Sequence, residues 1–105
     1  MLTNPNGSIE SSYHDVNINV TPKQLIDLCT KYDIKFHMCN DGEDKVNFDF
    51  EFGTEDGLRF FVYDWKEYRS LSLNETVSFH IGAKDRSTSN KAYDILQEEL
   101  SLLNI

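Results

Sequence analysis

The fold is decided by the stretch VNFDFEFGTEDGLRFFVY, residues 46–63. Apolar side chains alternate with polar ones from Val46 to Phe52, and this period of two indicates a strand with one buried face. Residues 53–57, Gly-Thr-Glu-Asp-Gly, have the composition of a hairpin turn. Residues 58–63 return as a second strand with bulky groups on both faces. We therefore expect an antiparallel hairpin at the centre of the fold.

A helix is predicted on the N-terminal side of this hairpin, over residues 22–32. Thr21 can cap it, and Gln24 completes a capping box. Alternating apolar residues predict a strand before the helix, residues 16–20, and another after it, residues 34–38.

On the C-terminal side, a further strand is predicted over residues 77–81. It runs through Gly82 into a short polar loop. An amphipathic helix follows, because apolar side chains recur at helical spacing from Ala92 to Leu103.

The element order is therefore β-α-β-β-β-β-α, which predicts an α+β protein. We expect a single domain over residues 15–105, preceded by a flexible N-terminal tail over residues 1–14. Its mainly antiparallel sheet of four or five strands should carry both helices on one face. The side chains expected on that face are Phe36, Phe48, Phe50, Phe60, Val62 and Phe79.

Composition limits the classes of function. The chain has 105 residues, 39% of them hydrophobic, which is typical of a globular domain. No apolar run reaches the roughly 20 residues that a membrane span needs. The start of the chain lacks the features of a secretory signal, and Cys29 and Cys39 have neither disulfide nor zinc spacing. We therefore expect a cytoplasmic protein without a cofactor or a membrane partner.

The net charge of −8 is unevenly distributed. Residues 41–56 hold seven acids and one lysine, whereas residues 57–91 hold six bases and four acids. Such a chain should not bind nucleic acid nonspecifically. Its basic half suits a small anion, and its acidic half suits a basic groove on another protein.

The loop before the last helix is the first candidate site. It contains Lys84, Arg86, Ser87, Thr88 and Ser89. The first backbone N–H groups of a helix lack intrahelical partners, and the helix dipole is positive there, so these residues could bind a phosphate-like anion. The Gly-rich pattern of a P-loop is absent. The alternative is an exposed turn in which one of these hydroxyls caps the helix.

A second candidate is the aromatic cluster at the end of the predicted hairpin. Trp65 and Tyr68 lie three residues apart and could flank a planar group, while Arg69 could pair with an anion. Alternatively, these side chains cover one end of the core.

The second face of the sheet should carry titratable side chains. Alternation places His37, Asp49 and His80 there, which permits the hypothesis of a small metal-dependent hydrolase. No HExxH or comparable motif supports it, so we rank this hypothesis last and expect a protein that is not an enzyme. Phe61 and Tyr63 on the same face make a homodimer a reasonable expectation.

Two short segments, YDWKEYR at residues 63–69 and FHIG at residues 79–82, resemble a pattern in small uncharacterised accessory proteins of tailed bacteriophages. The resemblance implies a protein that acts in an infected bacterial cytoplasm. Many such proteins antagonise host defence by binding and neutralising a host factor.

Two main hypotheses follow. In the first, a non-enzymatic accessory protein sequesters an anionic, nucleotide-like ligand: the loop of residues 84–89 holds phosphate, and Trp65, Tyr68 or His80 contacts a base. In the second, the protein is an acidic nucleic-acid mimic that inhibits a host nucleic-acid-binding protein. Its interaction surface would comprise Asp41, Glu43, Asp44, Glu55 and Asp56.

Overall fold

The structure is a computed structural model that describes residues 2–5, 11–43 and 45–103. The strands in this part of the chain are β1 (Leu2–Thr3), β2 (Ser12–Val20), β3 (Phe36–Met38), β4 (Phe48–Thr54), β5 (Arg59–Tyr63) and β6 (Val77–Ala83). The helices are α1 (Pro22–Lys31), which follows β2, and α2 (Arg86–Leu103), which follows β6.

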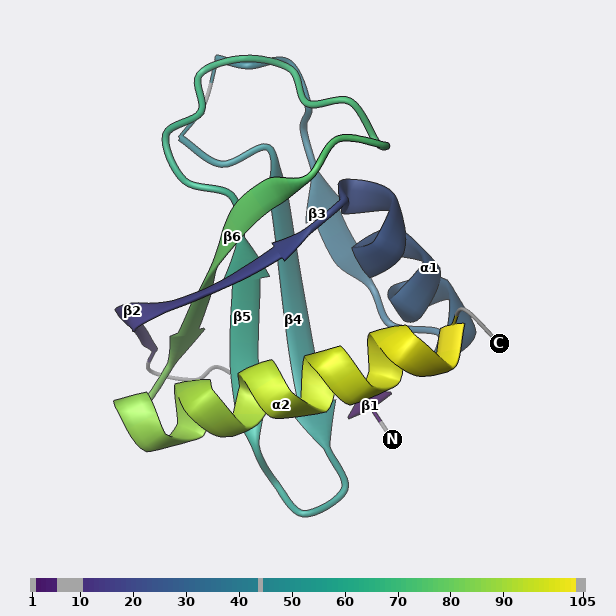
Figure 1. Ribbon diagram of the computed structural model, residues 1–105, viewed down its shortest axis with the longest axis vertical. Coiled ribbons are helices and arrows are strands. Elements are labelled where there is room, and N and C mark those ends of the chain that lie inside the picture. Colours follow the sequence, from purple (N-terminus) through teal and green to yellow (C-terminus); the bar gives the residue numbers. More distant parts are fainter. Residues whose placement is uncertain (1, 6–10, 44, 104–105) are drawn as a thin grey trace.

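The strands form one six-stranded antiparallel sheet in the order β1-β4-β5-β6-β2 (Figure 1). β3 pairs with β4 on the same edge as β1, because β5 occupies the other edge. The central hairpin pairs Phe50 with Val62 and Phe52 with Phe60. The α+β class and the antiparallel hairpin are confirmed, with the short β1 as an addition.

Both helices pack on the face of the sheet that carries the aromatic core. In Figure 1, α2 crosses β4 and β5, and α1 lies beside β3. The ring of Phe50 is central to this core: its centroid lies 5.2 Å from that of Phe36 and 6.3 Å from that of Phe79. Of the side chains expected on this face, Phe36 is half-buried and the others have no exposed surface: Phe48, Phe50, Phe60, Val62 and Phe79.

The start of α1 agrees with the sequence pattern. The backbone N–H of Thr21 donates to Gln24 Oε1 at 2.9 Å, and that of Gln24 donates to Thr21 Oγ1 at 3.1 Å, which completes the capping box. The hydroxyl of Tyr32, just after α1, donates to the Glu99 carboxylate on α2, and this bond raises the pKa of Tyr32 to about 12. Neither α1 nor α2 is long and apolar enough to cross a membrane.

The N-terminal residues differ from the predicted flexible tail of residues 1–14. Leu2 lies in β1 and is only 2% exposed, and β2 begins at Ser12, earlier than the predicted strand. The register of β2 shifts between Tyr13 and Asn17. A two-residue strand has no period, and the register shift lies in the first half of β2, so β1 and the start of β2 were not predicted from the sequence pattern, whereas residues 16–20 were. Residues 6–10 lie outside the described residues.

Candidate functional site

The face of the sheet opposite the helices carries a transverse row of polar side chains. The strand register pairs His37 with Asp49, Asp49 with Tyr63, Tyr63 with His80, and His80 with Asn17. Paired residues in antiparallel strands point to the same face. These five side chains therefore cross the sheet from β3 to β2 in a single line, called the transverse row below.

A hollow of about 440 Å³ opens along this row. The row contributes Asp49 and Tyr63 near its middle and His37 at one end. The full lining is Ser11, Ser12, His37, Lys45, Val46, Asp49, Phe61, Tyr63 and Trp65. The volume falls within the range of small-molecule sites, and the lining combines aromatic surface with a few polar groups, as such sites do.

Aromatic rings form one side of the hollow and continue beyond it. Trp65 meets Tyr63 edge to face, with ring centroids 6.1 Å apart and an interplanar angle of 82°. His80 lies 5.5 Å from Tyr63 and 6.5 Å from Trp65. Tyr13 stacks on the far side of this group, 3.9 Å from His80 and nearly parallel to it. Four rings thus form a continuous aromatic surface, which is suited to a planar ligand.

Asp49 lines the hollow with a carboxylate that has no hydrogen-bond partner among the described residues. Its side chain is half-buried, and no N–H or O–H group of the described residues donates a hydrogen bond to its carboxylate. Burial raises the pKa of Asp49; the neighbouring charge of His37 lowers it and that of Asp64 raises it further. The carboxylate therefore has hydrogen-bonding capacity that only water or a ligand can use.

The other titratable members of the row are also affected by burial. Burial lowers the pKa of His80, although Glu67 opposes this shift, so the imidazole is neutral at pH 7. Burial raises the pKa of Tyr63, with smaller contributions from Tyr13 and Asp49. The aromatic side of the site is therefore uncharged at neutral pH.

Two lysines provide positive charge near the Trp65 ring, and one of them, Lys45, also lines the hollow. The Nζ of Lys66 lies 5.6 Å from the centroid of the Trp65 ring, and that of Lys45 lies 6.0 Å from it. Both distances fall in the range of cation–π contacts. An anionic group on a ligand stacked at Trp65 would be within reach of both ammonium groups.

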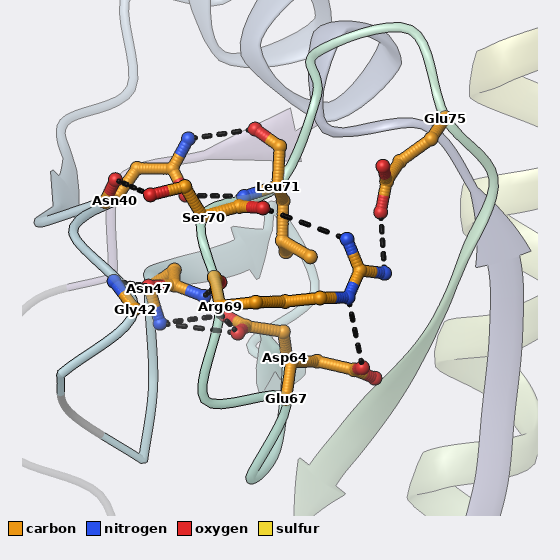
Figure 2. A network of polar contacts seen from close by, with 9 residues as sticks. All are labelled: Asn40, Gly42, Asn47, Asp64, Glu67, Arg69, Ser70, Leu71 and Glu75. Atoms are coloured by element: carbon orange, nitrogen blue, oxygen red, sulfur yellow. Dashed lines mark hydrogen bonds and ion pairs between the residues drawn. The ribbon is translucent and has the colours of Figure 1, made fainter.

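Trp65 is held in place by a buried carboxylate next to it in the chain. Asp64 has no exposed surface and joins the end of β5 to the start of β4. Its carboxylate accepts from the backbone N–H groups of Asn47 at 2.9 Å and Phe48 at 2.7 Å, and from Asn47 Nδ2 at 3.1 Å. Figure 2 shows the Asp64 and Asn47 side chains facing each other within this network. The network sets the position from which Trp65 projects.

The loops around this network are also joined to each other. Asn40 Nδ2 donates to the Leu71 carbonyl and Leu71 N–H donates to Asn40 Oδ1, both at 2.7 Å (Figure 2). Gly42 has a φ of 78°, and a Cβ built on it would lie 2.7 Å from backbone atoms of Arg69. Lys66 and Tyr68 also have positive φ, a conformation that persists only where the surroundings enforce it. The loops beside Trp65 are therefore conformationally constrained. They are called the frame below, and they comprise residues 40–43, 45–47 and 64–71.

The structure changes the interpretation of the predicted anion loop. α2 begins at Arg86, so Ser87, Thr88 and Ser89 lie in its first turn, and the last two are buried. The cap is Asp85: the Thr88 N–H donates to its Oδ1 at 2.7 Å, and hydrogen bonds from Thr88 lower the pKa of this carboxyl. A carboxylate thus already occupies part of the helix N-terminus where phosphate was expected.

The two cations of that loop are also separated from the aromatic rings. Trp65 contacts His80 in the middle of β6, whereas Lys84 follows four residues later, about 13 Å along the strand. Figure 1 shows the start of α2 and the loop after β5 at opposite ends of β6. The structure therefore does not bring Lys84 and Arg86 together with Trp65 in one site.

Tyr68 and Arg69 belong to the frame rather than to the hollow. Among the described residues, the ring contacts of Trp65 are with Tyr63 and His80, and none is with Tyr68. Arg69 pairs with Glu75 at 2.6 Å, and its guanidinium extends toward that carboxylate in Figure 2. This bond raises the pKa of Arg69 and lowers that of Glu75.

The predicted acidic surface is divided between two ends of the molecule. Asp41 and Glu43 lie in the loop before β4, whereas Glu55 and Asp56 lie in the turn after it. β4 has seven residues, so about 20 Å of strand separates the two pairs. Asp44 lies outside the described residues. The described acids of the predicted surface therefore form two groups, and Asp49 and the exposed Glu51 lie on β4 between them.

The row also separates the residues of the hydrolase hypothesis. His37 is next to Asp49, but Tyr63 lies between Asp49 and His80. Three strand spacings place His37 and His80 about 14 Å apart. Within residues 2–5, 11–43 and 45–103, no group of three or more His, Cys, Asp or Glu residues is arranged to hold a metal ion.

Several residues of the site were not among the sequence candidates. Tyr13 and Ser12 fall in the predicted tail, and Lys45 lies in the acidic half of the chain. An aromatic residue at position 13 could have indicated an earlier start of β2, since Tyr13 and Asn17 pair with Gly82 and His80 and so lie on the same face, as alternation predicts. Nothing in the local sequence around Lys45 marks it as part of a site.

Comparisons of the chain with protein-family models, with curated proteins and with solved structures gave no significant match. Function is therefore inferred from the geometry of the sheet face opposite the helices, called the open face below.

Proposed function

We propose that this is a small non-enzymatic binding protein that captures a nucleotide on the open face of its sheet. In this proposal the base packs against Tyr63 and Trp65 within the hollow, and the phosphate group is held by Lys45 and Lys66. The phosphate site thus moves from the start of α2, which sequence reasoning favoured, to the two lysines near the Trp65 ring.

The observation that carries the proposal is the coincidence of ring surface and cavity. Phe61, Tyr63 and Trp65 all line one hollow of about 440 Å³, and His80 extends the ring surface beyond it. Stacking of one base on one aromatic ring contributes about 1–3 kcal/mol. A molecule that binds one nucleotide needs such a concave, ring-lined site far more than it needs a large basic surface.

Binding without turnover is favoured by the arrangement of the reactive groups. Nucleophilic or acid–base catalysis requires partners within hydrogen-bond distance, and Tyr63 separates Asp49 from His80. The accessory role implied by the resemblance to phage proteins is consistent with this, since sequestration of a host nucleotide needs only stoichiometric capture.

Trp65 provides a direct test because it is the sole tryptophan of the chain. Its fluorescence should change saturably when purified protein is titrated with AMP, GMP, CMP or UMP. Tyr63→Ala should weaken binding by roughly 5- to 150-fold, the equivalent of one lost stacking contact. Tyr93→Ala is the matched control, because Tyr93 is an exposed tyrosine on α2 outside the hollow, and it should bind as the wild type does.

A double variant, Lys84→Ala with Arg86→Ala, distinguishes the two phosphate sites. It should retain nucleotide binding, whereas Lys45→Ala with Lys66→Ala should lose most of it. The opposite result would place the phosphate at the start of α2. If no nucleotide changes the Trp65 fluorescence or the melting temperature, the proposed function is wrong.

A further inference from the structure

We propose that the captured base is guanine and that Asp49 recognises it, an inference that rests on the proposed function. The inference depends on the position of the Asp49 carboxylate next to the ring of Tyr63. Asp49 and Tyr63 are register partners on adjacent strands, and both line the hollow. A base packed against Tyr63 would therefore present its edge to Asp49.

The Asp49 carboxylate accepts no hydrogen bond from the described residues, although it is half-buried. This distinguishes it from Asp64, whose carboxylate is fully engaged by Asn47 and Phe48. A half-buried acceptor without a partner is unfavourable unless water or a ligand satisfies it. The structure thus leaves one strong acceptor free at the site where a base edge would lie.

Guanine has the base edge that best complements a carboxylate. Its N1–H and its 2-amino group are adjacent donors that can bond the two carboxylate oxygens in parallel, the same bidentate pattern that arginine uses. Adenine and cytosine each offer one amino donor beside a ring-nitrogen acceptor, and uracil offers one N–H between two carbonyls. In those three bases an acceptor would face the carboxylate, which is repulsive.

The neighbour of Asp49 on β3 is consistent with the same orientation. His37 is the register partner of Asp49 on the side away from Tyr63, and it lines the same hollow. Guanine O6 is the acceptor next to N1–H, so an imidazole N–H beside Asp49 can donate to it. Adenine has an amino donor at the corresponding position and would lose this bond.

Competition between GMP, IMP and XMP tests the assignment with the intact protein. IMP lacks only the 2-amino group, and XMP carries a carbonyl in its place. Wild-type protein should bind GMP at least tenfold more tightly than IMP or XMP. In Asp49→Asn the amide offers one acceptor and one donor, which matches N1–H and the 2-carbonyl of xanthine. This variant should therefore prefer XMP over GMP.

Glu51→Gln is the matched control, because Glu51 is an exposed carboxylate on the same strand and face that does not line the hollow. It should retain the preference for GMP. Equal affinity for all nucleotides, or loss of GMP binding in Asp49→Asn without a gain of XMP binding, would overturn the guanine assignment while leaving the proposed function intact. Failure of every nucleotide to bind would reject both.

Discussion

The two faces of the β4–β5 hairpin differ in composition and in burial. Phe60 and Phe61 are neighbours in the chain, yet the first has no exposed surface under the helices and the second lines the open hollow. On the covered face, aromatic rings fill the interior. On the open face, rings alternate with a carboxylate that has no partner within the described part of the chain. Alternation along the same two strands therefore separates the packed core from the face on which we propose ligand binding.

This separation teaches that the open face is not simply the solvated side of a sheet. A solvated face has exposed polar side chains satisfied by water, whereas here His80 and Asp49 have pKa values shifted by burial. Side chains on the open face are thus partly shielded from water, although no helix packs on this face. Stability and binding should therefore respond to different substitutions, and the following experiments measure how complete that division is.

The largest effect is expected when the two neighbouring phenylalanines are compared. Phe60→Ala should lower the free energy of unfolding by about 3–5 kcal/mol, because a large ring is lost from the packed core. Phe61→Ala should lower it by a smaller amount, about 1–2 kcal/mol, because the Phe61 side chain is only partly buried in the native state. Urea denaturation followed by circular dichroism measures both. Similar losses in the two variants would show that side chains on the open face contribute as much to the free energy of unfolding as those on the covered face.

A somewhat smaller effect is expected at the carboxylate that holds the frame. Asp64→Ala leaves the buried donors of Asn47 and Phe48 unpaired and should lower the free energy of unfolding by about 3 kcal/mol. Asp64→Asn keeps one oxygen acceptor and should recover part of this loss. The emission maximum of Trp65 in the folded protein is a second readout, since the frame sets the environment of its ring. An unchanged stability in Asp64→Ala would mean that water replaces the carboxylate without cost.

A matched pair of glycines tests how rigid the frame is. Gly42 and Gly57 both have positive φ, but a Cβ on Gly42 would meet the backbone of Arg69 at 2.7 Å, whereas nothing lies within 4 Å of one on Gly57. Gly57→Ala should cost about 1 kcal/mol from backbone strain alone. Gly42→Ala should cost about 2–3 kcal/mol, because the clash adds to the same strain. Thermal unfolding of the two variants compares them directly, and equal losses would indicate that the loops can separate.

The smallest effect is expected from Asp49→Asn. Because burial raises the pKa of Asp49, the folded state holds its proton more tightly than the unfolded state does. The native carboxyl thus favours folding at low pH, and this contribution is lost as pH rises through the raised pKa. The variant should be slightly more stable than the wild type at pH 7, and the difference should vanish at low pH. His37, Tyr63 and Lys45 face this position and are unchanged by the substitution. Lower stability of the variant at pH 7 would show that the Asp49 charge is stabilised in the folded protein.

Much of the fold was predictable because it depends on local or periodic features. The alternation from Val46 to Phe52 identified both faces of β4, and the Thr21–Gln24 capping box identified the start of α1. The start of α2 was harder to predict, since several hydroxyl residues compete as caps there. In the structure Asp85 caps the helix, and its negatively charged carboxylate makes the helix N-terminus less suited to bind an anion.

The candidate site was predicted only in part. Alternation placed His37, Asp49 and His80 on one face, and the structure agrees. Their separation depends on which strands are adjacent, and that information is not present in any single strand. The contact of Tyr13 with His80 could not be predicted, because the two residues lie 67 positions apart in the chain and on different strands.

The sequence by itself determined which residues lie on the covered face, because the period of two in a strand and the capping pattern of a helix are properties of neighbouring residues. Only the tertiary structure decided that His37, Asp49, Tyr63, His80 and Asn17 form one row, that Tyr13 stacks on His80, and that Asp64 joins the end of β5 to the start of β4. The physical reason is that strand order, register and bulges depend on contacts between segments far apart in the chain, which no local pattern encodes.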